Sequence, residues 1–430
     1  MILKVEPALS LKGRISLPAS KSYSIRALMI ASCGGVSRII NPSDCDDAKV
    51  AMKAARALGA AVAVLPQNQW KVTARRRPLR FSNINVKESG TVLRFLLPLV
   101  AIHGRKAVIR GEGTLRGRPN TFLLQTLRAM GIDIRGKDEK ESVPVRIEGG
   151  QLCGGDIEIN GSLSSQFISA LMIACPQLKE DTRLTLTGGE IVSSDYITMT
   201  LQILEKSGIR IRKRGLKTYD IKGSQTFQGL KDFRVPSDYG LAAFLMAAAV
   251  LNRSDVLLEG ALDEKLVQAD GHIFSFLKKM GVKFQKTSRQ IRIQGPFPLS
   301  GGDFSLKDCP DLVPIMSVLA LFAKTRTRLY DIRHARAKES DRISDLREEL
   351  LKVGAKVTEK DNELIVDPQP GYRQNCLLDP HQDHRLAMSF AVLGTKLGVR
   401  VQDMECMSKS YPGFVRDLRL LGVRATRIKE

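Results

Sequence analysis

Several kinds of residue are scarce in this chain of 430 residues. Aromatic side chains make up only 5% of it, so the cores that its 43% hydrophobic residues can form are aliphatic. Acidic residues number 45 against 67 lysines and arginines, which leaves a formal net charge of +22. This excess favours an anionic partner, which could be nucleic acid, a membrane surface or a polyanionic metabolite.

Cysteine and histidine patterns are also missing. The seven cysteines are odd in number and no two form a C-x-x-C pair, and the five histidines show no metal-ligand spacing. Such a set is typical of a reducing compartment, where disulfides are rare, and it gives no sign of a zinc site. We therefore expect a protein without disulfides or a bound zinc ion.

Long hydrophobic runs are absent as well. The longest uncharged apolar run, from Tyr239 to Asn252, is shorter than the about 20 residues that span a bilayer. No apolar stretch of signal-peptide type stands at the N-terminus. We expect a cytoplasmic protein that makes no membrane contact.

The basic residues are spread along the whole chain. Their densest run, Arg75 to Arg77, has no aromatic residues between its members. A protein that binds single-stranded nucleic acid stacks the bases on aromatic side chains. Nucleic-acid binding is therefore only a remote alternative, supported by net charge alone.

A short pattern occurs six times: the end of an amphipathic helix, a glycine, then an alternating strand such as Ile132-Asp133-Ile134 or Ile209-Arg210-Ile211. The glycines are Gly59, Gly131, Gly208, Gly281, Gly354 and Gly422, at spacings of 72, 77, 73, 73 and 68 residues. A glycine after a helix suits the left-handed position that ends it.

A second pattern recurs at a similar period: a nearly uncharged apolar helix that opens with polar residues. The openings are Ser20-Lys21-Ser22, Ser89-Gly90-Thr91, Ser164-Ser165-Gln166, Ser237-Asp238, Pro310-Asp311 and Asp383-His384-Arg385. Helices that are apolar on all sides are buried. Together the two patterns predict six copies of one α/β unit in two domains of three units each, with the changeover near residues 225 to 238.

The polar openings allow two interpretations. Serine and aspartate are good N-caps, so each opening can be the ordinary start of a core helix. Helix N-termini also bind anions, and a cation such as Lys21 or Arg385 at a helix start is unfavourable unless an anion lies there. Asp311 likewise allows two interpretations: a plain helix cap, or a carboxylate that takes part in the chemistry. The segment from Arg336 to Arg342 can be a solvated charged helix or part of a binding site.

Nine segments carry candidate chemistry. They are Pro18 to Arg26, Glu88 to Arg94, Gly111 to Pro119, Gly161 to Phe167, Ser193 to Tyr196, Asp311, Arg336 to Arg342, Asp383 to Arg385 and Ser408 to Pro412. They contain no Walker A motif and no complete G-x-G-x-x-G, so a nucleotide site is not supported. Their many lysines and arginines match a ligand load of two phosphates and two carboxylates.

In this order the nine segments resemble the motif set of the EPSP synthases, from Pro18 to Pro412. The resemblance implies an α/β fold of two similar domains, each with three βαβαββ units around buried parallel helices. It places the first strand, near Ile2 to Val5, with the C-terminal half. The implied domains are residues 1–16 with 236–430, and residues 17–235.

The resemblance also implies an activity: transfer of the enolpyruvyl group of phosphoenolpyruvate to the 5-hydroxyl of shikimate 3-phosphate, with release of phosphate, in the shikimate pathway. No cofactor, metal or nucleic acid takes part, and the family suggests a monomer. Residues implied for shikimate 3-phosphate are Lys21, Ser22, Arg26, Ser164, Ser165, Gln166, Ser193, Tyr196, Asp311 and Lys338. Those implied for phosphoenolpyruvate are Lys21, Gly90, Arg118, Gln166, Arg342, Arg385 and Lys409.

Asp311, Glu339 and Lys21 are the implied catalytic residues. The acceptor hydroxyl must lose a proton while C3 of the donor gains one, and the tetrahedral adduct then loses the C3 proton and phosphate. Two carboxyl groups in opposite protonation states can carry these protons. We assign the hydroxyl proton to Asp311 and the C3 proton to Glu339.

Three positions depart from the usual family pattern: Ala19, Glu88 and His334 stand where glycine, asparagine and asparagine are frequent. The main alternative is the sister enzyme of the same fold, UDP-N-acetylglucosamine enolpyruvyl transferase. Its sequences have Lys-Asn where this chain has Lys21-Ser22, and typically a catalytic cysteine in the loop that corresponds to Arg110 to Pro119, which contains none here.

Overall fold

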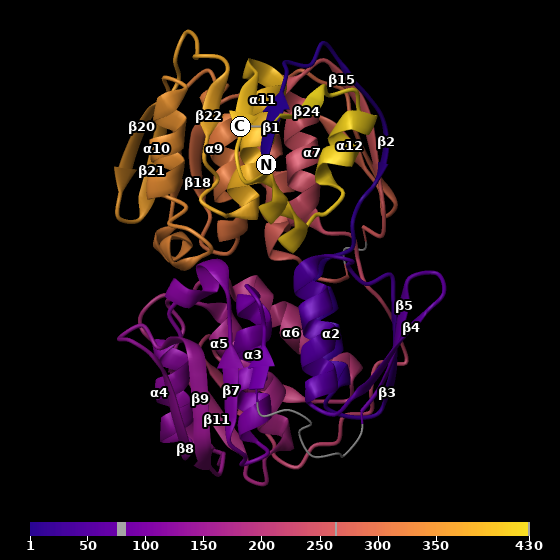
Figure 1. The fold of residues 1–430 in the computed structure, drawn as a ribbon, viewed down its shortest axis with the longest axis vertical. Helices are drawn as coiled ribbons and strands as arrows, with labels where there is room; N and C mark the ends of the chain where they lie inside the picture. The colour runs from indigo at the N-terminus through magenta and orange to yellow at the C-terminus, as the bar shows by residue number, and fades with distance from the viewer. Residues whose placement is uncertain (75–82, 263–264, 429–430) are drawn as a thin grey trace. The chain divides into compact units, whose positions relative to one another are not determined.

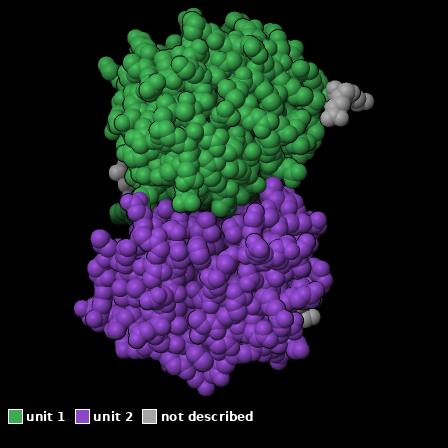
Figure 2. Space-filling model, turned by 90° about the vertical axis from the view of Figure 1, so that its left-hand side faces the viewer, with its two compact units in different colours: residues 1–18, 236–430 green, residues 19–235 purple. Residues whose placement is uncertain are grey.

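The computed structural model describes residues 1–74, 83–262 and 265–428, so the basic run Arg75 to Arg77 lies outside the described residues. The chain forms two compact units (Figures 1 and 2): unit 1 is Met1–Pro18 with Pro236–Glu430, and unit 2 is Ala19–Val235. Unit 1 is therefore built from both ends of the chain.

Unit 2 alternates helices and strands throughout. Its elements are α1 (Lys21–Ala31), β3 (Val36–Ile40), α2 (Asp46–Ala57), β4 (Ala61–Leu65), β5 (Gln69–Thr73), β6 (Asn83–Asn85), α3 (Gly90–Ala101), β7 (Ala107–Arg110), η1 (Gly113–Gly117), α4 (Thr121–Ala129), β8 (Ile132–Lys137), β9 (Ser142–Gly150), β10 (Gly155–Asn160), α5 (Ser165–Ala174), η2 (Cys175–Gln177), β11 (Thr182–Thr187), α6 (Ser194–Lys206), β12 (Ile211–Arg214), β13 (Thr218–Ile221) and β14 (Asp232–Arg234).

Unit 1 repeats the same alternation. Its elements are β1 (Ile2–Val5), β2 (Leu11–Ser16), α7 (Tyr239–Leu251), β15 (Ser254–Glu259), η3 (Ala269–Gly271), α8 (His272–Lys279), β16 (Phe284–Lys286), β17 (Gln290–Ile293), β18 (Gly302–Ser305), η4 (Pro310–Leu312), α9 (Val313–Leu321), β19 (Thr327–Tyr330), η5 (Arg333–Ala337), α10 (Ser344–Lys352), β20 (Lys356–Lys360), β21 (Glu363–Asp367), β22 (Cys376–Leu378), α11 (His384–Leu397), β23 (Val399–Val401), η6 (Met404–Lys409), α12 (Phe414–Leu420) and β24 (Ala425–Ile428).

The strands of the described residues form six four-stranded sheets of one design. In β6-β7-β9-β8, for example, the first pair is parallel and the next two pairs are antiparallel. The sheets β14-β3-β5-β4, β10-β11-β13-β12, β2-β15-β17-β16, β18-β19-β21-β20 and β22-β23-β1-β24 follow the same order of pairings. This confirms the six α/β units that the repeats predict.

The chain passes from unit 1 to unit 2 after Pro18 and returns after Val235, and the strand pairings reflect both passages. β1 lies between β23 and β24, and β2 pairs in parallel with β15, so the first 18 residues complete two sheets of unit 1. β14, near the end of unit 2, returns to pair with β3 near its start. Three sheets thus contain a strand from a distant part of the sequence: β1 in the interior of its sheet, and β2 and β14 at the edges of theirs.

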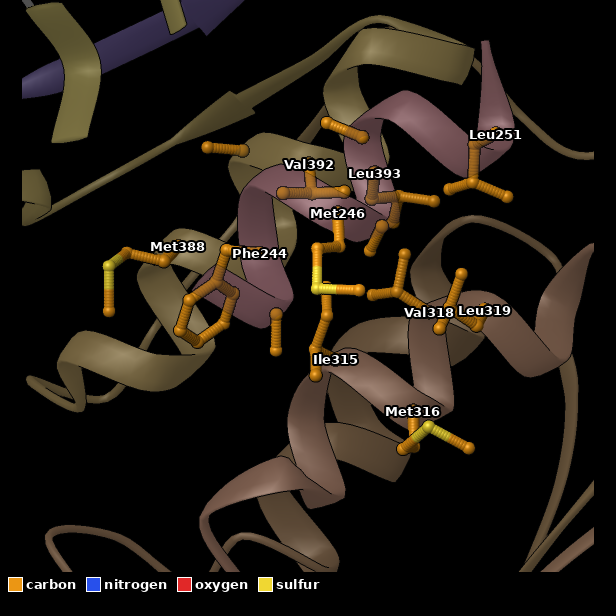
Figure 3. Close-up of a cluster of buried hydrophobic side chains, with 14 of the residues drawn as sticks. Phe244, Met246, Leu251, Ile315, Met316, Val318, Leu319, Met388, Val392 and Leu393 are labelled. Atoms are coloured by element: carbon orange, nitrogen blue, oxygen red, sulfur yellow. The ribbon is translucent and has the colours of Figure 1, made fainter. Parts of the chain in front are cut away.

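Three helices, α7, α9 and α11, pack against one another in the core of unit 1 (Figure 3). Every residue of α7 and of α9 is buried, as expected of helices without a polar face. Figure 3 shows Met246 of α7, Ile315 of α9 and Val392 of α11 among the clustered side chains. The packing is mainly aliphatic, which agrees with the low aromatic content.

The six repeat glycines end the six outer helices. Each is the first residue after a helix's C-cap, and their φ angles lie between 81° and 99°. Side chains other than hydrogen are strained in this region, so glycine is the residue that fits. The prediction of a left-handed helix end is confirmed for all six.

One strand begins later than its alternation predicts. The pattern Ile209-Arg210-Ile211 was expected to be strand throughout, but β12 starts at Ile211. The backbone N–H of Arg210 donates to the side chain of Gln225 at 2.8 Å, and the Gln225 amide donates back to the Arg210 carbonyl at 3.1 Å. A side-chain amide thus occupies the backbone groups that a neighbouring strand would need.

Candidate active site

In unit 2, the N-terminus of α1 is capped by Ser20 and carries the cation Lys21. Ser20 caps the helix by accepting a hydrogen bond from the Tyr23 N–H at 3.4 Å. Lys21 is the first helical residue, and its Nζ lies 3.1 Å from Asp47 Oδ2 on α2, with both side chains mostly buried. The carboxylate offsets the unfavourable placement of a lysine at a helix N-terminus.

Arg26, one turn further along α1, is 1% exposed and lies between α1, α3 and α6. Its Nε donates to Thr200 Oγ1 at 2.9 Å, and its Nη atoms donate to the carbonyls of Ser22 and Tyr196 at 3.2 and 3.3 Å. Burial lowers the pKa of this guanidinium to about 10, and the nearby Tyr196 and Tyr23 oppose the shift. Within the described residues no carboxylate pairs with Arg26, which leaves a buried positive charge for an anion.

A second cluster of unit 2 joins the start of α3 to the η1 turn. A Cβ on Gly90 would lie 2.8 Å from Arg118 Nη1, so the guanidinium packs directly on this glycine. Nearby, Arg94 Nη1 donates to Gln166 Oε1 at 2.6 Å, and the Gln166 amide donates to Thr91 Oγ1 at 3.0 Å. The predicted residues Gly90, Arg118 and Gln166 are thus held by neighbouring elements.

The serines of unit 2 stand at two helix starts. Ser164 is the N-cap of α5 and accepts from the Gln166 N–H at 3.3 Å, and Ser165 is the first residue of that helix. Ser193 precedes α6 with φ 57°, a left-handed conformation that is strained for serine. Such strain often accompanies a functional position. All three serines are buried.

Glu88 forms hydrogen bonds to the loop that leads to Arg118. Its Oε2 accepts hydrogen bonds from the Thr114 N–H and hydroxyl at 3.0 and 3.1 Å. A Cβ on Gly113 would lie 2.3 Å from the same oxygen, so the carboxylate lies closely over this turn. The departure from the usual family residue therefore has a structural role in this chain.

In unit 1, one arginine forms ion pairs with three carboxylates. Arg342 is 1% exposed. It donates from Nε to Asp383 Oδ2 at 2.7 Å, from Nη1 to Asp311 Oδ1 at 2.7 Å and from Nη2 to Glu339 Oε2 at 2.9 Å. Burial opposes its charge, but the three acids outweigh burial and hold its pKa well above the usual value.

Asp311 contacts two guanidinium groups. Besides Arg342, its Oδ2 lies 2.8 Å from Arg385 Nη2, and its carbonyl accepts from Arg385 Nη1 at 3.1 Å. Burial raises the pKa of this carboxyl, but Arg385, Arg342 and Lys338 together hold it well below its usual range. These three cations thus keep Asp311 ionised.

The structure decides both alternatives left open for this region. Asp311 lies inside the η4 turn, and its side chain caps neither η4 nor α9, so its interpretation as a plain cap is wrong. Residues 336–342 are not a solvated charged helix, because η5 ends at Ala337 and Arg342 is buried.

The remaining predicted residues of unit 1 lie around the Arg342–Asp311 cluster. Lys338 directly follows η5 and acts electrostatically on Asp311. Asp383 caps α11 by accepting from the Arg385 N–H at 2.8 Å while it binds Arg342. Lys409, at the end of η6, donates from Nζ to the Gln382 carbonyl at 2.9 Å. Asp311, Lys338, Glu339, Arg342 and Arg385 therefore form one cluster.

His334 is buried beside the same cluster. Burial lowers its pKa to about 3; Lys338 adds to the shift, and Asp311 opposes it. The imidazole is therefore neutral at physiological pH and adds no positive charge to those of Arg342 and Lys338.

Several supporting residues were not assigned from the sequence: Asp47 on Lys21, Thr200 on Arg26, Asn120 on Arg94, Asp383 on Arg342 and Asp270 on Arg385. Apart from Asp383, none stands in the nine segments, so only spatial proximity identifies them. Over the described stretches, no group of three or more His, Cys, Asp or Glu side chains could hold a metal ion, and no helix is long and apolar enough to cross a membrane.

Comparison with solved structures defines the class of fold. An EPSP synthase from Acinetobacter baumannii superposes with a TM-score of 0.78 at 24% identity, over 99% of this chain and all of that one. The enolpyruvyl transferase NikO from Streptomyces tendae gives a TM-score of 0.78 at 19% identity, over 99% of this chain and 98% of its own. The fold is that of the enolpyruvyl transferases, as predicted.

Sequence comparison defines the family. The family model of EPSP synthase (3-phosphoshikimate 1-carboxyvinyltransferase) matches residues 5–418. Proteins named 3-phosphoshikimate 1-carboxyvinyltransferase are 35% identical in Methanocaldococcus jannaschii, over 98% of both chains, and 32% identical in Methanococcus aeolicus, over 98% of this chain and 99% of that one. The chain belongs to the EPSP synthase family, which confirms the resemblance drawn from its motifs.

Proposed function

We propose that this chain transfers the enolpyruvyl group of phosphoenolpyruvate to the 5-hydroxyl of shikimate 3-phosphate and releases phosphate. The observation that carries the proposal is the family match across residues 5–418. The Asp311–Arg342–Glu339 cluster supports it, because two carboxyl groups on one arginine suit a reaction that moves two protons.

The reaction has two balanced steps. The acceptor hydroxyl attacks C2 of the enol phosphate and gives up its proton, while C3 takes one up. The tetrahedral adduct then loses a proton from C3, the C2–C3 double bond re-forms, and phosphate leaves from C2. In this proposal Asp311 accepts the hydroxyl proton. Glu339 transfers the proton at C3, and Lys21 is the third catalytic residue.

Asp311 must become a better base when substrate binds. Arg342 and Arg385 both bind its carboxylate in this structure, which makes it a weak base. The carboxylate and phosphate of the donor would compete for the same two guanidinium groups. Such competition raises the proton affinity of Asp311 at the moment that the hydroxyl needs a base.

The residues of unit 2 supply the other contacts. Arg26 is buried, and no carboxylate among the described residues pairs with it, so it is suited to an anionic group of shikimate 3-phosphate. The other residues proposed for this substrate are Ser22, Ser164, Ser165, Ser193 and Tyr196. Lys21, Gly90, Arg118 and Gln166 would bind the donor, with Arg342, Arg385 and Lys409 of unit 1. Buried guanidinium groups bind phosphate and carboxylate more strongly than exposed ones because water competes less.

Phosphate release tests the proposal. Purified protein is given phosphoenolpyruvate and shikimate 3-phosphate with EDTA present, and each substrate is omitted in turn. Release that needs both substrates supports the proposal. Release with UDP-N-acetylglucosamine instead of shikimate 3-phosphate would show that the sister enzyme is the better assignment, and no release from folded protein would reject both.

The proton carriers can be tested by isosteric substitution. Asp311→Asn and Glu339→Gln each remove one proton carrier and should lower kcat by about 10²–10⁴-fold, the usual contribution of general acid–base catalysis. Asp255→Asn is the control, because its carboxylate pairs with Arg292 on an exposed sheet surface. Near-normal kcat in the Asp311 or Glu339 variant would show that its assigned role is wrong.

Three further expectations belong to the same proposal: action as a monomer, location in the cytoplasm, and a division into two domains, residues 1–16 with 236–430 and residues 17–235. Sedimentation equilibrium at the concentrations used for the assay should give the mass of one chain, 47.5 kDa. A mass of two chains that persists on dilution would contradict the monomer.

A further inference from the structure

Asp270 is a buried acid of unit 1 that the reaction described above does not use. It lies in η3, just before α8, and is 6% exposed. Its Oδ2 is 3.5 Å from Arg385 Nη2, the nitrogen that also contacts Asp311. Its Oδ1 finds no hydrogen-bond donor among the residues that the structure describes. Among the described residues, Arg385 is therefore the ion-pair partner that links Asp270 to the site.

The start of α7 leaves room for this carboxylate. A Cβ on Gly240 would lie 2.0 Å from Asp270 Oδ2 and 3.1 Å from Arg385 Nη1. Any other residue at position 240 would displace the acid from the guanidinium. Since glycine in the first turn of a helix otherwise costs stability, its presence here fits a pocket shaped around the Asp270–Arg385 pair.

The charges that face Asp270 come from four elements. They are Arg385 on α11, Asp311 in η4, Asp238 at the start of α7 and Lys338 after η5. Burial raises the pKa of Asp270 to about 7; Asp311 and Asp238 add to the shift, while Arg385 and Lys338 oppose it. The charge of Asp270 thus changes within the physiological pH range, next to an arginine assigned to the donor.

We propose that Asp270 is a positioning residue that acts through Arg385: its negative charge opposes binding of the anionic donor there, and the donor binds together with a proton on Asp270. The inference rests on the proposed function, in which Arg385 binds phosphoenolpyruvate. The proton comes from solvent and forms the carboxyl O–H bond, and no other bond changes. Once neutral, Asp270 no longer competes with the donor for the guanidinium.

The test compares pH profiles of the wild type and Asp270→Asn, which keeps the shape and removes the titration. The KM for phosphoenolpyruvate is measured at pH 6, 7 and 8, with shikimate 3-phosphate saturating. Since Asp270 ionises as the pH rises through 7, the wild-type KM should rise relative to that of the variant by at least about threefold, the effect of half a pKa unit of coupling. Titration of the donor phosphate affects both proteins equally and cancels in the ratio.

Two controls separate this role from a structural one. The KM for shikimate 3-phosphate should show the same pH profile in both proteins. Glu349→Gln removes another fully buried acid of unit 1, one that accepts from Lys352 and the Asp379 N–H, and should leave the wild-type pH profile of the donor KM unchanged. Parallel donor profiles in the wild type and Asp270→Asn, from active proteins, would overturn the inference.

A second measurement needs no variant. Calorimetric titration of the wild type with phosphoenolpyruvate at pH 7.5, in two buffers of different ionisation enthalpy, reports the protons taken up on binding. Uptake is expected, and binding without uptake would overturn the inference. If the donor binds with proton uptake but no phosphate is released from both substrates, the proposed function fails and the charge coupling at Arg385 stands.

Discussion

Two buried arginines show how the surroundings of a residue set its task. Arg26 and Arg342 are each 1% exposed, yet one has only neutral acceptors among the described residues and the other has three carboxylates. Burial accordingly lowers the pKa of Arg26, whereas the acids raise that of Arg342. The first arginine is ready for an external anion, while the second binds one only by releasing an acid of its own chain.

Arg26→Met tests this view of the first arginine. The change removes a charge that is assigned to shikimate 3-phosphate, and the KM for that substrate should rise by about 10–100-fold, as a lost charge-assisted bond of about 1.5–3 kcal/mol implies. Methionine fills similar space and removes an uncompensated buried charge, so the thermal midpoint should fall by less than about 4 °C.

The comparison variant for Arg26 is Arg128→Met, because Arg128 bonds only within unit 2, to the Ile134 carbonyl at 2.9 Å and to Glu141 at 2.9 Å. Its KM values should match those of the wild type. An unchanged KM for shikimate 3-phosphate in Arg26→Met would remove Arg26 from the site.

The element that decides most about the site is the helix start. Ser20, Ser164, Asp238 and Asp383 all accept from a backbone N–H of the helix that follows. Each of these residues thus caps its helix and fixes where the next side chains point. At α11 one carboxylate does both, since Asp383 caps the helix and binds Arg342. Loss of such a residue would disturb the helix and the site together.

Gly240→Ala tests the start of α7. Alanine normally stabilises a helix by about 0.5–1 kcal/mol relative to glycine. Here the added Cβ would meet the Asp270 carboxylate at 2.0 Å, so we expect a loss of about 1–3 kcal/mol in the free energy of unfolding. The same Cβ would lie 3.1 Å from Arg385 Nη1 and displace the guanidinium assigned to the donor, so the KM for phosphoenolpyruvate should rise while that for shikimate 3-phosphate should not.

Gly271→Ala is the matched variant for Gly240→Ala, because its added Cβ would touch the Tyr239 ring at an ordinary 3.4 Å. Thermal unfolding and initial rates measure both variants. A more stable Gly240→Ala protein with normal KM values would show that the Asp270–Arg385 pair tolerates displacement.

At the scale of the whole molecule, the two units differ in how the chain builds them. Unit 2 is one continuous segment, whereas unit 1 needs both chain ends, because β1 is an interior strand between β23 and β24. Without β1 these two strands lose their common partner, and unpaired backbone groups in a sheet are costly. The first 18 residues are therefore structural rather than a dispensable terminus.

Fragments of the chain test this topology. Residues 19–235 should unfold cooperatively by themselves, and residues 236–430 should not. Ile2 faces Ile428 in the strand register, so joining residues 1–18 behind residue 430 through a short linker should restore a cooperative transition to the second fragment. Circular dichroism during heating measures all three proteins, and a stable fold of residues 236–430 alone would contradict the role given to β1.

The sequence alone determined much of this protein. Local rules fixed the six left-handed glycines, the buried helices and their polar starts, because each depends on the backbone and hydrophobic preferences of a few neighbouring residues. The ordered motifs then indicated the family and nearly all the candidate residues. The strand start at Ile211 escaped the local pattern, since a side chain 15 residues away, that of Gln225, binds the backbone of Arg210.

Only the tertiary structure decided which charges meet. Arg342 and Asp311 are separated by 31 residues, and Asp270 lies 115 residues before Arg385, so no local pattern pairs them. Electrostatic interaction depends on distance and burial in space, not on separation along the chain. The sequence therefore predicted a site rich in cations, whereas the fold gave the Arg342–Arg385 cluster four acids of its own and placed no described carboxylate on Arg26.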